Sequence, residues 1–214
     1  MRGRGAHIAF AGIDGAGKSV QAGLLVRRLS DAGLPSYLME GKEDFVVQVM
    51  QSIAARHGRP VRVHFGSEGA DLAKAFDTLR DQAHMVNPLT ANGTFVVQPR
   101  TAYDRLALAR AAGSRNLAVV EEVSFYAGGP DVTFWMDVPV EVAIERIARR
   151  GIDSEDPAAL RRFATELTAM APHHDWIRID GNRDVPAVHE EIWRIIEARF
   201  DLAPIPHARV GAQA

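Results

Sequence analysis

The segment Gly12-Ile-Asp-Gly-Ala-Gly-Lys-Ser19 constrains this chain more than any other feature. It satisfies the pattern of glycine, any four residues, glycine, lysine and serine. It stands between the apolar run 7–11 and a stretch of helical periodicity that starts at Ser19. Glycines permit a tight turn in which successive backbone N–H groups point at phosphate oxygens, and the positive end of the following helix adds to the attraction. The pattern predicts a phosphate-binding loop within an α/β fold.

Each position of this loop has an expected role. The backbone of Gly12, Ile13, Asp14, Gly15, Ala16 and Gly17 would surround the phosphates of ATP, and Lys18 would neutralise the β and γ phosphates. The Ser19 hydroxyl is placed to join the oxygen shell of Mg²⁺, which makes Ser19 the candidate metal ligand. Lys18 is also one of three lysines in a chain that otherwise uses arginine as its basic residue.

Short apolar runs alternate with helical patterns along the chain. The runs 7–11, 36–39, 94–98, 132–136 and 176–179 predict five strands. Helices are expected from Ser19 to a stop at Gly33, over 45–56, 72–86 and 103–112, after Pro139, and around 188–196, with a loop spanning Gly58 to Gly69. The segment 116–126 fits a helix or a strand. This alternation predicts an α/β three-layer sandwich with a five-stranded parallel sheet, of the P-loop NTPase type.

Length and composition bound the remaining organisation. A chain of 214 residues with 47% hydrophobic content can bury one substantial core, so residues 1–202 are expected to form one domain and 203–214 a mobile tail. The 25 basic and 27 acidic residues nearly cancel, which argues against nucleic acid or a membrane as a partner. The absence of cysteine and of a long apolar window leads us to expect a cytoplasmic protein.

Other residues separate the classes of protein that use such a loop. A GTPase would need a late asparagine-lysine-x-aspartate segment, and the nearest string, Asn182-Arg-Asp184, does not match. A motor ATPase would usually have a strand that ends in paired acids, whereas Met136-Asp137 is followed by Val-Pro. These differences favour a kinase.

The chain resembles the thymidylate kinases from about Ile8 to Phe200. Three stretches carry the likeness: the loop in the form Gly-Ile-Asp-Gly-Ala-Gly-Lys-Ser, the run from Gly129 to Arg146, and the segments Ile179-Asp-Gly-Asn-Arg183 and Val188-His-Glu-Glu-Ile192. The resemblance implies a helix over 117–127. It also implies ATP as phosphate donor, Mg²⁺, a homodimer, and dTMP as the default acceptor.

The resemblance also implies site residues. Phe76 and Arg80 fall where the family lines the acceptor base, and their four-residue spacing puts both on one helical face. Arg100 falls where the family grips the acceptor phosphate, a task that suits a guanidinium fork. Asp14 would face the acceptor sugar. The remaining candidates are arginines: Arg146, Arg149 and Arg150 at the edge of the lid, and Arg183 beside the adenine. Each of these side chains has a structural alternative, as a core, capping or solvated residue.

The chain departs from the family on the acceptor side. Where the family usually has an aspartate before the arginine, this chain reads Gln98-Pro99-Arg100-Thr101. Arg105 and Leu108 align with the family's thymine-side polar residues, the usual run after the second strand is replaced by residues 40–44, and the lid 151–159 contains no arginine. Glu40 or Asp137 could substitute for the missing acid.

We therefore expect ATP-dependent phosphoryl transfer to a nucleoside monophosphate, with Lys18, Arg100, Arg149 and Arg150 in catalysis. Two alternatives stay open: a kinase of the same fold that acts on a modified nucleotide or another small molecule, and a regulator that binds ATP without transferring phosphate.

Overall fold

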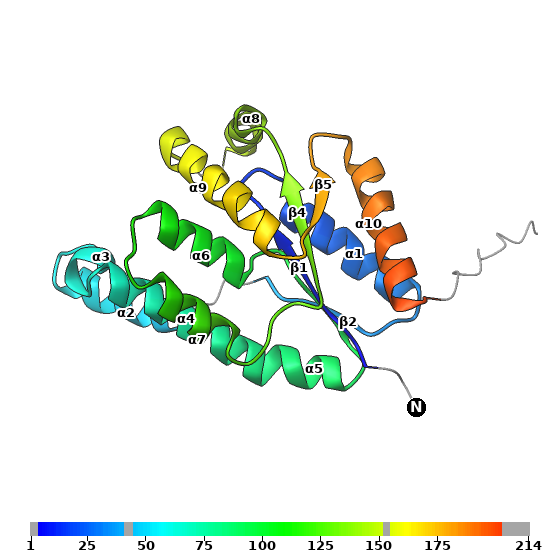
Figure 1. Cartoon of the computed structure of the whole chain (residues 1–214), viewed down its shortest axis with the longest axis horizontal. Helices are drawn as coiled ribbons and strands as arrows, with labels where there is room; N and C mark the ends of the chain where they lie inside the picture. The colour runs from blue at the N-terminus through cyan, green and yellow to red at the C-terminus, as the bar shows by residue number, and fades with distance from the viewer. Residues whose placement is uncertain (1–3, 41–44, 152–154, 203–214) are drawn as a thin grey trace, which may run out of the picture.

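The computed structural model describes residues 4–40, 45–151 and 155–202 of the chain (Figure 1). The predicted mobile tail, 203–214, lies outside the described residues, as do most of the segment after the second strand and part of the predicted lid.

Five parallel strands form one sheet in the order β2-β3-β1-β4-β5. The strands are β1 His7–Ala11, β2 Ser36–Leu38, β3 Phe95–Gln98, β4 Val132–Asp137 and β5 Ile177–Asp180. All five predicted strands are confirmed to within one or two residues at each end. Because β1 is central, the loop that follows it lies between the segments that follow β3 and β4.

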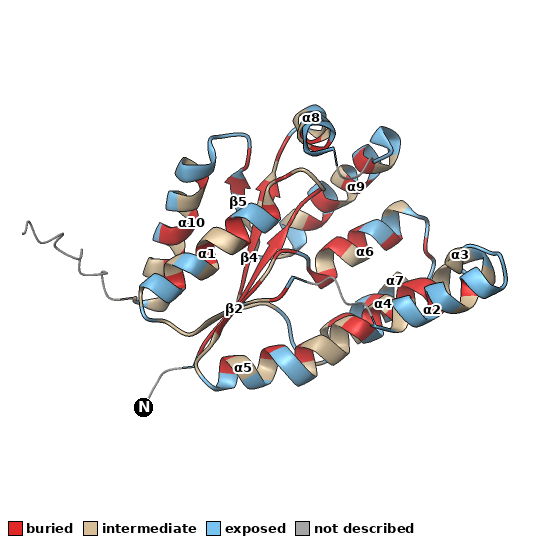
Figure 2. Cartoon of the chain, turned by 180° about the vertical axis from the view of Figure 1, so that it is seen from behind, coloured by how far each residue is buried: buried red, intermediate tan, exposed pale blue. Residues whose placement is uncertain are grey.

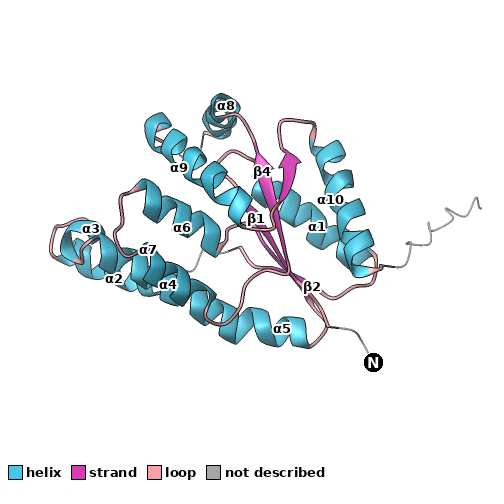
Figure 3. Ribbon diagram, viewed as in Figure 1, coloured by secondary structure: helices cyan, strands magenta, loops and turns pink. Residues whose placement is uncertain are grey.

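Helices cover both faces of the sheet (Figure 3). The helices are α1 Lys18–Asp31, α2 Phe45–Arg56, α3 Val61–His64, α4 Ser67–Asp81, α5 Asn87–Ala91, α6 Ala102–Ala111, α7 Leu117–Phe125, α8 Val140–Arg150, α9 Pro157–Met170 and α10 Val185–Phe200. A π-helical turn, Gln82–Val86, joins α4 to α5, and a 3₁₀ turn, Ala171–His173, follows α9. Helices α1 and α10 lie on one side of the sheet, and α4, α6, α7 and α9 on the other (Figure 1).

The sandwich predicted from the alternating pattern is confirmed, and so is the helix at α7. One local expectation was wrong, and two helices, α5 and α9, were missed. The region around Gly58 to Gly69 contains α3, and α4 begins at Ser67, so that Gly69 is helical. Helix α9 was not predicted. Its apolar positions, which include Leu160, Phe163 and Leu167, become buried against α6 and α8.

The core lies on both faces of β1 and β4 (Figure 2). Phe10 and Phe134 pack with their ring centroids 5.5 Å apart, and Trp193 from α10 is fully buried on the α1 side. Burial on both faces fixes the strands, and with them the loops at their carboxyl ends. Within the described residues, we find no helix of a length and apolarity that would suit a membrane span.

Candidate active site

The loop between β1 and α1 is held close to β4 and α8. Gly12 and Gly15 have φ of +150° and +82°. A Cβ at Gly12 would lie 2.9 Å from the carbonyl oxygen of Met136, and one at Gly15 would lie 2.5 Å from that of Ala143. Glycine is therefore required at both positions by the backbone conformation and by the close approach of neighbouring backbone. The loop keeps its backbone amides free of side-chain bulk, as a phosphate-binding loop must.

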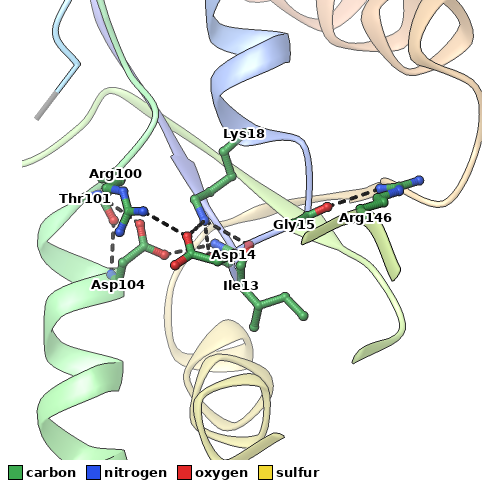
Figure 4. Close-up of polar contacts among 9 residues, drawn as sticks. Ile13, Asp14, Gly15, Lys18, Arg100, Thr101, Asp104 and Arg146 are labelled. Carbon is green, nitrogen blue, oxygen red and sulfur yellow. Dashed lines mark hydrogen bonds and ion pairs between the residues drawn. The ribbon is translucent and has the colours of Figure 1, made fainter. Parts of the chain in front are cut away.

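Lys18 is buried, and its amino group turns back onto the loop (Figure 4). Its Nζ donates to the carbonyl oxygen of Gly12 at 2.5 Å and to that of Ile13 at 3.0 Å. Burial lowers the pKa of Lys18, and the carboxylates of Asp104 and Asp14 oppose that shift. A buried cation needs compensating charge, and these two acids supply it.

Asp14 connects the loop to the segment after β3. Arg100 Nη2 lies 3.0 Å from Asp14 Oδ1, and Lys18 Nζ lies 3.8 Å from the same oxygen. Because β1 and β3 are parallel neighbours, their carboxyl ends bring the loop and Arg100 together. The structure thus brings together three of the predicted site residues.

Asp104, on α6, is a site residue that the sequence analysis missed. It is 5% exposed, and its carboxylate accepts from the backbone N–H of Gly12 at 3.0 Å and from that of Thr101 at 2.9 Å. Thr101 in turn accepts from the N–H of Asp104, which completes a capping box at the start of α6. Burial raises the pKa of Asp104, while Lys18 and the two amides oppose that shift. The spacing Thr-x-x-Asp in the sequence indicates the helix cap. It does not indicate the contact between Asp104 and Gly12.

A cavity of about 300 Å³ opens in front of the loop. Its walls contain residues 13–19 of the loop, together with the arginines Arg100, Arg146, Arg150 and Arg183. Arg146 Nη1 donates to the carbonyl oxygen of Gly181 at 3.0 Å, and Arg183 pairs with Glu191 on α10. The cavity therefore has arginines beside the loop, two of which, Arg100 and Arg146, contact it, and this charge distribution suits a polyphosphate.

The other predicted residues lie elsewhere. Arg149 is exposed on α8 and is not among the described residues that line this cavity. Arg80 lies 3.2 Å from Asp77 and 2.6 Å from Asp81, and it lines a separate hollow beside Phe45. Phe76 is 49% exposed on the same helix. The structure does not bring Phe76 and Arg80 into the cavity with Arg100, and their role at the acceptor base stays a prediction.

The residues around the loop fit a nucleotide with a magnesium ion. Gly17 has φ of +92°, and no side chain caps α1, which leaves the first amides of that helix for an anion. Ser19, in the first turn of α1, is exposed and lines the cavity in front of the loop. Across the described parts of the chain, no group of three or more His, Asp or Glu residues could hold a metal alone. Mg²⁺ usually keeps several waters and binds substrate phosphates, so Ser19 and the phosphates of a bound nucleotide would be the groups to hold it.

Of the two acids proposed to substitute for the one missing at position 99, Asp137 is already engaged. Its Oδ2 accepts from Arg178 Nε at 2.8 Å and from Nη2 at 2.5 Å. Glu40 is exposed at the end of the described segment after β2. Asp104, on α6, accepts the N–H of Gly12, the first residue of the loop.

The parallel sheet, the glycine-rich loop after its central strand and the arginine-lined cavity define a P-loop nucleotide-binding protein. The family model for thymidylate kinase matches residues 10–192. The chain belongs to the thymidylate kinase family, as the resemblance indicated.

Individual relatives agree over most of the chain. A thymidylate kinase of Fervidobacterium nodosum is 27% identical over 203 residues, which cover 89% of this chain and 98% of that protein. A thymidylate kinase of Thermosipho melanesiensis is 29% identical over 208 residues, covering 91% of this chain and 98% of the relative. A thymidylate kinase of Rhodopseudomonas palustris is 29% identical over 229 residues, covering 99% of this chain and 95% of the relative.

Proposed function

We propose that this chain transfers the γ-phosphoryl group of ATP to the phosphate of a nucleoside monophosphate, with dTMP as the default acceptor. The bond between the γ phosphorus and the β–γ bridging oxygen breaks, an acceptor phosphate oxygen forms the new bond, and the products are ADP and a nucleoside diphosphate. The contact between Arg100 and Asp14 carries the proposal, because it brings a candidate clamp for the acceptor phosphate against the loop that holds the donor.

Positioning and charge explain how the site would act. The loop amides and Lys18 bind the β and γ phosphates, and Arg100 offers two parallel N–H donors to the acceptor phosphate. Arg146 and Arg150, with their side chains at the cavity, stabilise charge on the transferring group, and Arg183 contacts the nucleotide. Mg²⁺, held by Ser19 and the phosphates, would neutralise charge that develops on the phosphate oxygens. The reaction needs no strong base, because phosphoryl transfer depends mainly on alignment and electrostatics.

A second acceptor class is favoured by the acceptor side of the site. Arg105 donates to the carbonyl oxygen of Lys74 at 2.9 Å, so that it fastens α6 to α4. Leu108 lines a small cavity next to Asp14 and Arg100, together with Leu160 and Phe163. Charged side chains also line this cavity, among them Lys18, Asp104 and Glu155, so the change from the family is confined to Leu108, which stands where the resemblance places a polar side chain. A modified base that makes one polar contact fewer than thymine would suit this position.

ATP consumption measured across a panel of nucleoside monophosphates tests the proposal and separates the alternatives. Turnover with dTMP as the best acceptor supports the default. Turnover with another nucleotide supports the second class. A protein that binds ATP but releases no ADP above background with any acceptor would be a regulator, and the kinase proposal would be wrong.

A further inference from the structure

Asp104 contacts two segments that meet phosphate in the proposed reaction. One carboxylate oxygen accepts the N–H of Gly12, the first residue of the loop, and the other accepts the N–H of Thr101, the residue after Arg100. One of these segments follows β1 and the other follows β3. They are far apart in the sequence, since Gly12 and Asp104 are separated by 92 positions. The carboxylate is therefore a direct link between donor loop and acceptor clamp.

We infer that Asp104 is a positioning residue for phosphoryl transfer: it fixes Arg100 relative to the phosphate-binding loop by holding the amides of Gly12 and Thr101 on one carboxylate. This inference rests on the proposed function and adds a residue to it. Pro99, beside Arg100, has neither an N–H nor a polar side chain with which to make such a link.

Helix capping alone does not account for these contacts. Asp156 and Asp184 cap α9 and α10 by accepting amides of their own helices. Asp104 is instead the third residue of α6: it accepts the N–H of the N-cap residue Thr101, and it also accepts the N–H of Gly12 in a distant loop. The bond to Gly12 is unnecessary for the helix, so it serves the arrangement of the loop.

Charge gives a second reason for an acid at this position. Lys18 and Asp104 are both buried, and each favours the charged form of the other. An amide at 104 would keep the size of the side chain but would lose the charge, and its nitrogen could not accept from a backbone N–H. One of the two hydrogen bonds would then be lost, and the backbone N–H of either Gly12 or Thr101 would be left buried without an acceptor.

Asp104→Asn tests the inference through the kinetic constants for the best acceptor. Misplacement of a reacting group by about 1 Å can cost roughly 100-fold in rate. We expect kcat to fall by about that factor, while KM for ATP changes by less than about threefold because the loop amides and Lys18 remain. A folded variant that keeps kcat within about twofold of the wild type would overturn the inference.

Coupling to Arg100 separates positioning from general stability. If Asp104 acts through Arg100, the effect of Arg100→Lys should shrink to a few-fold in the Asp104→Asn background. Asp71→Asn is the matched control, since Asp71 is also a buried acid, 3% exposed, and it pairs with Arg62. Asp71→Asn should lower stability. In the double variant with Arg100→Lys, the fold-losses of kcat of the two single variants should multiply, as expected for independent sites. If the fold-losses of kcat from Asp104→Asn and Arg100→Lys also multiply in their double variant, the inference is contradicted.

Two further measurements keep the test decisive. If Asp104→Asn does not fold, Asp104→Ser gives a side chain too short to link both amides, and the same loss of kcat is expected. Native-state hydrogen exchange of the wild type should show the Gly12 amide protected like the core amides of β1, and rapid exchange there would rule out the link. A wild type without kinase activity across the nucleotide panel would overturn the proposed function. An active wild type with an unimpaired Asp104→Asn variant would overturn this inference alone.

Discussion

The guanidinium of Arg100 donates to the carboxylate of Asp14 across 3.0 Å, so that a residue after β3 contacts the phosphate-binding loop after β1. Lys18 lies 3.8 Å from the same carboxylate. One acid thus serves two cations that would each bind a phosphate. In the proposed reaction, bound phosphates would compete with Asp14 for both cations.

Lys18→Ala should abolish most of the activity. The variant removes the cation expected at the β and γ phosphates, and loss of one such preorganised group typically costs about 100-fold to 1,000-fold in kcat. Lys74→Ala, on α4, is the control for removal of a lysine away from the loop. Single-turnover assays on proteins shown to be folded by circular dichroism would measure the effect. Near-native turnover in Lys18→Ala would exclude the assigned role.

Arg100→Lys should be costly although it conserves charge. A single ammonium cannot reproduce two parallel hydrogen bonds to a phosphate. We expect kcat/KM for the acceptor to fall by at least about tenfold, while KM for ATP changes little. Arg110→Lys is the matched control, because Arg110 is on α6 and pairs with Glu166 outside the cavity. An equal effect of the two substitutions would show that Arg100 is not the phosphate clamp.

Pro99→Asp tests whether the acid that is missing before Arg100 limits the use of dTMP. Without that acid, we expect wild-type turnover of dTMP to be slow for a kinase, below the range of about 1 to 100 per second. Pro99→Asp should raise it by restoring a carboxylate next to the clamp. Wild-type turnover within that range would show that the acid is dispensable. If the wild type is slow and Pro99→Asp does not raise dTMP turnover, the slow turnover would be attributed to Arg105 and Leu108.

His7 should make stability depend on pH. Burial lowers its pKa from 6.5 to about 4, its Nε2 lies 3.0 Å from Gln98 Oε1, and its Nδ1 has no hydrogen-bond partner. As pH falls from about 6.5 to 4, His7 becomes protonated in the unfolded chain but stays neutral in the folded chain. The unfolding free energy therefore falls.

The two pKa values correspond to a loss of about 3 kcal/mol from this group. Urea unfolding between pH 7.5 and 4.5 would measure it, with His7→Gln as the comparison because carboxylates also titrate in this range. Between these two pH values, the unfolding free energy of His7→Gln should fall by about 3 kcal/mol less than that of the wild type. Identical slopes would show that His7 is not the group responsible.

The sequence predicted the sheet and the loop because both have short-range signals. The run before Gly12 is apolar and short, and the loop pattern lies within eight consecutive residues. Asp104 was missed because its contact with Gly12 depends on β1 and β3 being neighbours, which no local pattern records. Helix α9 could have been predicted, because Leu160, Phe163 and Leu167 recur at helical spacing, the same local signal that identified the other helices.

The acceptor side shows the same limit. The resemblance to the family implied that Arg80 lines the acceptor base, but it did not reveal that Arg80 pairs with Asp77 and Asp81. Both carboxylates lie within one helical turn of Arg80, and Asp77 also contacts the amino end of α2. Asp77 accepts the N–H groups of Val46 and Val47 there.

Product analysis tests the central claim most directly. Purified protein would be incubated with ATP, Mg²⁺ and dTMP or the best acceptor of the panel, and both products would be quantified by chromatography over time. We expect ADP and the nucleoside diphosphate to form in a one-to-one ratio, and both to be lost together in Lys18→Ala. ADP without a phosphorylated acceptor, or equal product formation by Lys18→Ala, would contradict phosphoryl transfer at this loop.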